Sequence, residues 1–150
     1  MTRRSRVAAV AFAATAALVP LQVACSSKGS TTGALDQVAP TKADVAHDAG
    51  IYFPPSTETF RLVRTAPGQI DVTFDIASAD APAFAAKSGL TLTPGNRVIL
   101  HASPVWDLAV KGSVEGGTSV RRGIRRSAEV VQSPDGPTAT VRLTLSPEKP

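Results

Sequence analysis

The sequence predicts an α+β domain: an antiparallel sheet of about five or six strands with one short helix packed on one face. Three observations lead to this fold class. Two stretches alternate apolar and polar residues around a turn, which is typical of hairpins with one buried face. A third stretch has the residues that begin and end a short helix. Because strands outnumber helices, the helix is expected to cover one face of the sheet.

The first hairpin is expected over ETFRLVRT and QIDVTFDIA, residues 58–65 and 69–77. Between them, Pro67 and Gly68 suit a type II turn, because glycine accepts the positive φ that this turn requires. The helix is expected over APAFAAKS, residues 81–88. Asp80 can cap its start, Pro82 fits its first turn, and Gly89 suits its end.

The middle of the domain carries weaker signals. LTLTPGNRVILHAS and PVWDLAV, residues 90–103 and 104–110, are expected to add short strands around a Pro-Gly-Asn turn. KGSVEGGTS, residues 111–119, is expected to be a loop because of its glycines. The second hairpin is expected over SAEVVQ and TATVRLTLS, residues 127–132 and 138–146, which flank the turn residues SPDGP.

The N-terminus has the pattern of a secretory signal. A basic segment, MTRRSR, precedes residues 7–19, which are apolar except for one threonine. As a helix this run covers roughly 20 Å, short of the roughly 30 Å needed to cross a bilayer core. Residues 1–24 are therefore predicted to be a signal peptide and not a transmembrane anchor.

Cys25 is the only cysteine of the chain, and it follows QVA and precedes a stretch rich in Ser, Gly and Thr. This arrangement resembles a bacterial lipoprotein signal, in which cysteine becomes the first mature residue. The resemblance implies a diacylglycerol on Cys25, usually with an acyl chain such as palmitate on its amine, and anchoring to the outer face of the cytoplasmic membrane. The alternative is cleavage after ACS and a secreted protein. Neither form has a disulfide.

Residues 25–50 are poor in bulky apolar side chains and are predicted to be a flexible tether. Residues 51–147 then form a single small globular domain. The order of signal, tether, FPPSTETFRLVR, IDVTFDI and terminal hairpin is similar to that of small lipoproteins of high-GC actinobacteria. This resemblance implies where in the cell the protein is located, and it implies no activity.

Charge excludes one class of partner. The formal net charge is +4, from 16 basic and 12 acidic residues, but Arg3, Arg4 and Arg6 belong to the predicted signal. Subtracting these three leaves 13 basic residues against 12 acidic ones. A nearly neutral mature protein lacks the basic footprint of a nucleic-acid-binding domain, so no nucleic-acid partner is expected.

The segment RRGIRR is the most distinctive local feature. Its guanidiniums belong to Arg121, Arg122, Arg125 and Arg126. They could bind phosphate or carboxylate groups of anionic lipid or anionic wall polymer. The alternative is a solvated edge strand, on which positive charges discourage aggregation.

Other polar residues are candidates for catalysis. Asp71 and Asp75 point to one face, but about 13 Å apart along a strand, beyond the reach of a paired-carboxylate site, so a solvated face is expected. His47 falls in the predicted tether. His101 is expected on the polar face; with Asp107 and either Ser103 or Ser113 it could form a hydrolase triad, although no nucleophile motif accompanies it. No catalytic residues, metal site or cofactor are predicted.

The function expected from the sequence is therefore that of a membrane-anchored extracytoplasmic lipoprotein. It would act as a non-catalytic binding or interaction module of the cell envelope, with an anionic lipid, an anionic wall polymer or an envelope protein as partner. The alternative is a small secreted hydrolase that uses His101, Asp107 and a serine.

Overall fold

Six antiparallel strands form one sheet in the order β1-β2-β6-β5-β4-β3. The computed structural model describes residues 40–149. Its elements are α1 (Lys42–Asp48), β1 (Glu58–Ala66), β2 (Gln69–Ala77), the short 3-10 helix η2 (Ser78–Asp80), α2 (Ala81–Ser88), β3 (Thr93–Pro94), β4 (Ser113–Arg121), β5 (Ile124–Gln132) and β6 (Thr138–Pro147). The predicted α+β class, with a sheet of five or six strands, is confirmed.

Both predicted hairpins are present as β1–β2 and β5–β6. The first turns at Gly68, whose φ of 72° is the left-handed conformation that glycine adopts without strain. The alternating apolar residues of β2 and β6 all point to one side of the sheet, where they are buried. The alternation of apolar and polar residues in the sequence thus corresponds to one buried face of the sheet.

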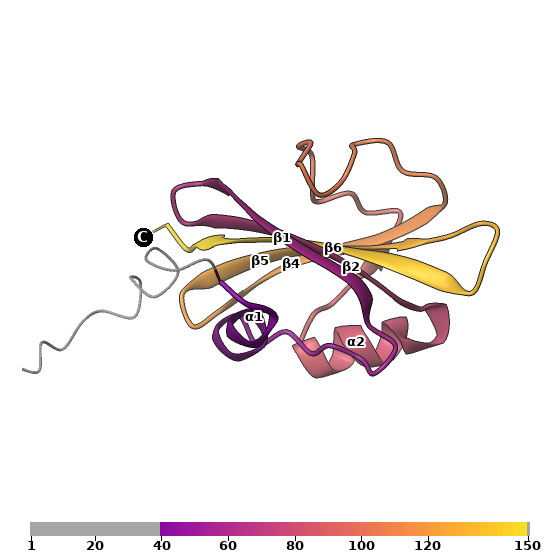
Figure 1. The fold of residues 1–150 in the computed structure, drawn as a ribbon, viewed down its shortest axis with the longest axis horizontal. Coiled ribbons are helices and arrows are strands. Elements are labelled where there is room, and N and C mark those ends of the chain that lie inside the picture. The colour runs from indigo at the N-terminus through magenta and orange to yellow at the C-terminus, as the bar shows by residue number, and fades with distance from the viewer. Residues whose placement is uncertain (1–39, 150) are drawn as a thin grey trace, which may run out of the picture.

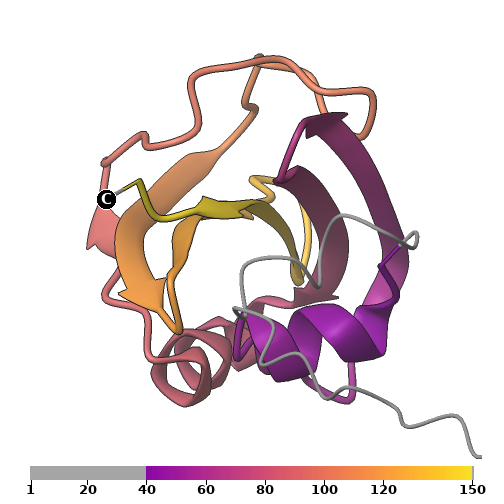
Figure 2. The same ribbon diagram turned by 90° about the vertical axis from the view of Figure 1, so that its left-hand side faces the viewer.

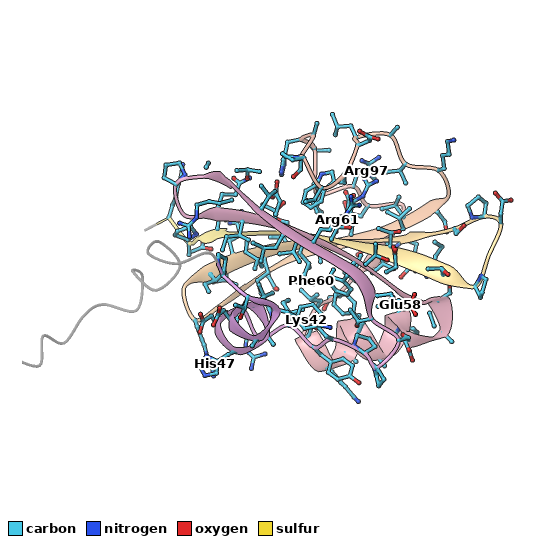
Figure 3. All side chains as sticks on the ribbon, in the orientation of Figure 1. Lys42, His47, Glu58, Phe60, Arg61 and Arg97 are labelled. Carbon is cyan, nitrogen blue, oxygen red and sulfur yellow. The ribbon has the colours of Figure 1, made fainter. Side chains whose placement is uncertain are left out.

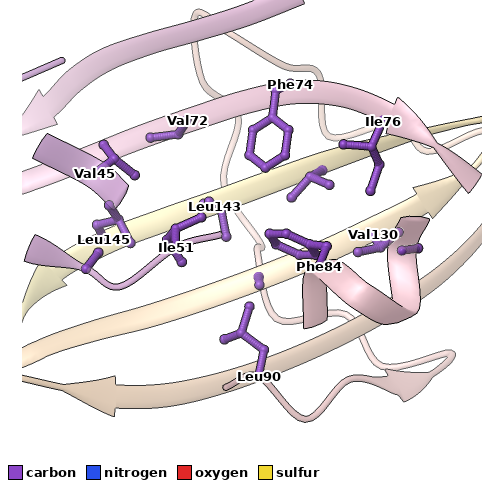
Figure 4. Packing of buried hydrophobic residues seen from close by; sticks show 14 of the residues in the cluster. Val45, Ile51, Val72, Phe74, Ile76, Phe84, Leu90, Val130, Leu143 and Leu145 are labelled. Atoms are coloured by element: carbon purple, nitrogen blue, oxygen red, sulfur yellow. The ribbon is translucent and has the colours of Figure 1, made fainter. Parts of the chain in front are cut away.

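The main core lies between this face and the two helices, which Figure 1 shows on the same side of the sheet. Phe84 of α2 is fully buried and meets the ring of Phe74 of β2 edge to face, with centroids 5.8 Å apart. As predicted, α2 ends at Gly89, which has a φ of 62°. The packing is shown in Figure 4, and the core includes Val45, Ile51, Ile70, Val72, Phe74, Ile76, Phe84, Leu90, Val130, Val141, Leu143 and Leu145.

Helix α1 corrects the predicted boundary of the tether, because residues 42–48 of the expected tether 25–50 are helical. Thr41 and Asp44 form a capping box at the start of α1, and these hydrogen bonds to Thr41 lower the pKa of the Asp44 carboxyl. Val45 is buried in the core, and the Lys42 ammonium lies 5.0 Å from the centre of the Phe53 ring. One buried valine, a cap and a cation–π contact therefore help to order a segment with few bulky apolar residues.

Strand β4 corrects a second prediction, because most of KGSVEGGTS is a strand and not a loop. Two of its glycines allow the backbone of a neighbouring segment to lie very close to the strand. A Cβ on Gly116 would lie 2.3 Å from the carbonyl oxygen of Asn96, and one on Gly117 would lie 2.0 Å from that of Thr91. Glycine within a strand can mark such a contact as well as a loop.

Residues 95–112, here called the covering loop, replace the strands that were expected over residues 97–110. Only β3, two residues long, forms beside β4. The covering loop crosses the sheet on the side opposite the helices, as Figures 1 and 2 show. The part of the second face around Asp71, Glu129 and Arg142 is therefore buried, and not solvated as the sequence suggested.

Candidate functional site

The covering loop packs on the second face of the sheet through a small hydrophobic cluster. Ile99, Val105 and Trp106 are buried there, and Val63 of β1 packs against them. A connection of this length without secondary structure is uncommon in a compact domain, and such loops are usually functional. How the covering loop is held in place therefore identifies the candidate site.

Glu129 of β5 is the main polar contact under the covering loop, and it is completely buried. Its Oε1 accepts hydrogen bonds from the backbone N–H groups of Val98, at 2.8 Å, and Ile99, at 2.9 Å. The same oxygen accepts a hydrogen bond from Nε of Arg97, at 3.2 Å. One carboxylate oxygen thus accepts hydrogen bonds from three donors of the loop. The negative charge of the carboxylate makes these hydrogen bonds stronger than neutral ones.

Arg142 of β6 stands directly opposite Glu129 in the sheet and is also buried. It donates a hydrogen bond to the carbonyl of Ala109, at the far end of the covering loop. Burial lowers the pKa of Arg142, whereas the charge of Glu129 raises it. An arginine stays charged even so. Two buried residues of opposite charge, which no ion pair joins, therefore hold the two ends of the loop, while Glu129 forms its ion pair with Arg97.

His101 attaches the middle of the covering loop to β2. Its Nε2 lies 2.9 Å from Oδ2 of Asp71, which is completely buried, and Thr144 donates to the other oxygen of Asp71 at 3.0 Å. The Trp106 indole N–H donates to the His101 carbonyl at 3.1 Å. The His101 side chain itself is 38% exposed, so one edge of the imidazole faces solvent.

The hydrolase triad considered from the sequence does not assemble as expected. The carboxylate beside His101 is Asp71, whereas Asp107 is exposed. Ser103 makes a backbone bridge to Trp106, and Ser113 is exposed at the start of β4. Placing Asp71 on a solvated face was wrong, because the covering loop buries it; Asp75 instead accepts a hydrogen bond from Thr140.

The arginine segment RRGIRR spans the turn between two strands: Arg121 ends β4, and Arg125 and Arg126 lie in β5. Arg122 and Gly123 form the turn, both with positive φ, and Arg121 pairs with Ile124. Arg126 is buried, so it cannot belong to an exposed anion-binding edge, and that part of the prediction is corrected. The guanidiniums of Arg121, Arg122 and Arg125 remain exposed.

Arg126 holds the ends of both helices. Its Nη1 donates to the carbonyls of Ala49, at 3.0 Å, and Ser88, at 2.8 Å, and its Nη2 donates to that of Gly89, at 3.3 Å. Its Nε donates to Ser119 of β4 at 3.1 Å. Burial and the neighbouring charge of Arg121 lower the pKa of Arg126. Carbonyls at helix C-termini carry partial negative charge, so this is a favourable place for a buried cation.

The outer surface of the covering loop presents apolar side chains to solvent. Leu100 is 75% exposed and Leu108 is 45% exposed, whereas Val105 and Trp106 between them are buried against the sheet. Figure 3 shows Arg97, near the start of the covering loop, on the opposite side of the sheet from Lys42 and His47 of α1. His47 is exposed on α1 beside Asp48 and takes no part in this site.

Comparisons with protein-family models, with curated proteins and with solved structures find no match to this chain. Within residues 40–149, no helix is long and apolar enough to cross a membrane. The same residues contain no group of three or more His, Cys, Asp or Glu side chains placed to hold a metal ion. The predicted signal peptide and Cys25 lie outside the described residues.

Proposed function

We propose that this protein is a lipid-anchored, extracytoplasmic binding module of the cell envelope. Its recognition element is the covering loop, and its partner is an envelope protein with an apolar groove. The observation that carries the proposal is the contrast within the loop: its backbone is fixed by buried charges, whereas Leu100 and Leu108 point into solvent.

A single exposed leucine needs no explanation, because folded proteins expose much apolar surface. Here, however, the two leucines belong to a segment whose backbone hydrogen bonds end on a buried carboxylate. A loop fixed before binding loses little conformational entropy when a partner docks, which raises affinity. The arrangement therefore favours recognition of an apolar pocket by a preorganised loop.

Exchange of Leu100 and Leu108 for serine is expected to weaken partner binding by about 10- to 100-fold, because two buried leucine contacts are lost. The partner is first found in cells that produce the full chain, with a photo-reactive residue at position 100. Its purified form is then titrated against wild type and variant. Val120→Ser is the matched control, since Val120 is 52% exposed but lies in β4.

The proposal fails if position 100 gives no discrete adduct, or if the control residue gives the same one. It also fails if the leucine variant binds the purified partner as tightly as wild type does. In contrast, an adduct that disappears when the covering loop is released by Glu129→Ala supports recognition by the ordered loop.

The lipid anchor predicts a separate result. Cells fed a fatty-acid analogue should incorporate it into the wild-type chain and not into Cys25→Ser. The reason is that the diacylglycerol is attached to the Cys25 thiol, and the amine is acylated only after that step. The intact mass of the mature protein measures the start site and the modification together. An unlabelled wild type that is released to the medium would mean a secreted protein instead.

A second candidate, a hydrolase, is favoured by one observation: the contact of His101 with a buried carboxylate, which is how a general base is oriented. Its residues would be His101 and Asp71, with Asp71 in place of Asp107. His101→Ala should leave ester and amide hydrolysis unchanged if the binding module is correct. Loss of a measured hydrolytic activity in a folded His101→Ala protein, with His47→Ala active, would favour the hydrolase.

A further inference from the structure

We propose that one end of the domain, the β4–β5 turn together with α1, is a contact surface for anionic phospholipid headgroups. This inference rests on the membrane anchor of the proposed function and deepens it, because it states which end of the domain faces the bilayer. It concerns a different part of the molecule from the covering loop.

The β4–β5 turn lies against α1. Nη1 of Arg122 donates to the His47 carbonyl at 2.7 Å, and Nη1 of Arg121 donates to that of Gly50 at 3.4 Å. Helix α1 is seven residues long, so its two ends are about 10 Å apart. Pro40, the first described residue, is therefore close to the arginine turn, and Figure 1 shows α1 and the β4–β5 turn at the same end of the domain.

The turn offers both kinds of group that a membrane surface binds. Arg121, Arg122 and Arg125 are exposed, and within residues 40–149 Arg125 forms one ion pair, a partly exposed one with Glu148 at 3.5 Å. A guanidinium has five N–H donors, so one hydrogen bond to a carbonyl leaves donors for a phosphate. Val120, next to the arginines, is 52% exposed. Basic and apolar side chains together are typical of interfacial contact.

The predicted anchor brings this end to the bilayer. Residues 25–39 separate Cys25 from Pro40, and this length spans at most about 50 Å even when fully extended. The predicted tether thus joins the domain at the end that carries the arginine turn. The covering loop lies on the opposite side of the sheet from α1, where Figure 2 shows it well separated from that helix. A domain that rests on its arginine turn therefore leaves the covering loop free for a protein partner.

The test uses soluble residues 26–150, which keep the whole sheet, both helices and both hydrophobic clusters. Wild type should bind phosphatidylglycerol vesicles at low salt and should bind phosphatidylcholine vesicles much less. Binding should weaken as salt screens the exposed charges. Exchange of Arg121, Arg122 and Arg125 for glutamine should weaken it on the order of a hundredfold, whereas exchange for lysine should retain most of it.

A matched control removes the same charge elsewhere: Arg61, Lys87 and Lys111, all exposed, are changed to glutamine. It should keep most of the binding. The inference is overturned if wild type ignores anionic vesicles at low salt, if binding does not respond to salt, or if the control loses as much affinity as the arginine variant. Binding to anionic wall polymer without binding to vesicles would also overturn it.

These results are separate from those of the anchor. A chain that is labelled at Cys25 but ignores phosphatidylglycerol keeps its anchor and loses the proposed surface. A chain that binds vesicles through its arginines but takes up no fatty-acid label would support the contact surface and contradict the lipid anchor. Circular dichroism and Trp106 fluorescence confirm that each variant is folded before it is compared.

Discussion

Exchange of Arg126 for leucine is expected to lower the free energy of unfolding by about 3–5 kcal/mol, a large part of the total stability of a small domain. The guanidinium donates to the carbonyls of Ala49, Ser88 and Gly89, and leucine leaves all three without that partner. Urea denaturation followed by circular dichroism measures the change, and the midpoint should fall at an unchanged slope.

Two variants make the Arg126 result specific. Arg126→Lys keeps the charge but cannot reproduce the planar fork that contacts both helix ends, so it should also destabilise, though less than leucine. Arg125→Leu changes the neighbouring residue, whose side chain is 55% exposed, and should alter stability by less than about 0.5 kcal/mol. Equal losses for Arg125→Leu and Arg126→Leu would contradict the helix-holding role.

Exchange of Glu129 for alanine is expected to release the covering loop and to cost about 3–5 kcal/mol. It removes the ion-pair partner of Arg97 and the negative charge that acts most strongly on the buried Arg142. The backbone N–H groups of Val98 and Ile99 would lose their acceptor and should exchange with solvent much faster. Trp106, the single tryptophan, is 7% exposed and should shift to a red-shifted, solvent-exposed emission.

The Glu129 experiment separates the loop from the sheet. Trp106 fluorescence reports on the covering loop, whereas circular dichroism reports mainly on the strands. In Glu129→Ala the fluorescence transition should have its midpoint at a lower urea concentration than the transition followed by circular dichroism. Glu129→Gln keeps one oxygen for the loop amides and places its amide where Oε2 has no hydrogen-bond partner, so its loss should be intermediate. Glu58→Ala, at an exposed position, is the control. Coincident transitions in Glu129→Ala would contradict the prediction.

The hairpins and α2 could be predicted because their signals are local. The alternation in β2 and β6 and the proline and glycine at the ends of α2 depend only on neighbouring residues. Helix α1 also had a local signal, the capping pair Thr41 and Asp44. The low apolar content around this pair indicated a flexible segment. The helix docks through one buried valine together with hydrogen bonds from Arg122 and Arg126 to the carbonyls at its end.

The candidate site could not be predicted because its contacts are long-range. Glu129 lies in a strand on the non-core face, a pattern that indicates a solvent-facing residue. What buries it is a segment about 30 residues earlier, whose sequence predicted short strands and not a loop that crosses the sheet. The same holds for Asp71 and His101. Both residues were expected on the polar face of the sheet, and this shared face is the one feature of the sequence that pointed to their contact. Nothing in the sequence indicated that the covering loop would bury that face.

The position of β6 has a consequence for the order in which the protein folds. β6 is the last strand in the chain but a central one in the sheet, and it pairs with both β2 and β5. Until residues 138–147 are available, the first hairpin and the β4–β5 hairpin have no common neighbour, so the main core cannot close. Pairings this distant in sequence form slowly, since loop closure must come first. A chain that emerges from its N-terminus onwards therefore keeps the sheet open until residues 138–147 have been released.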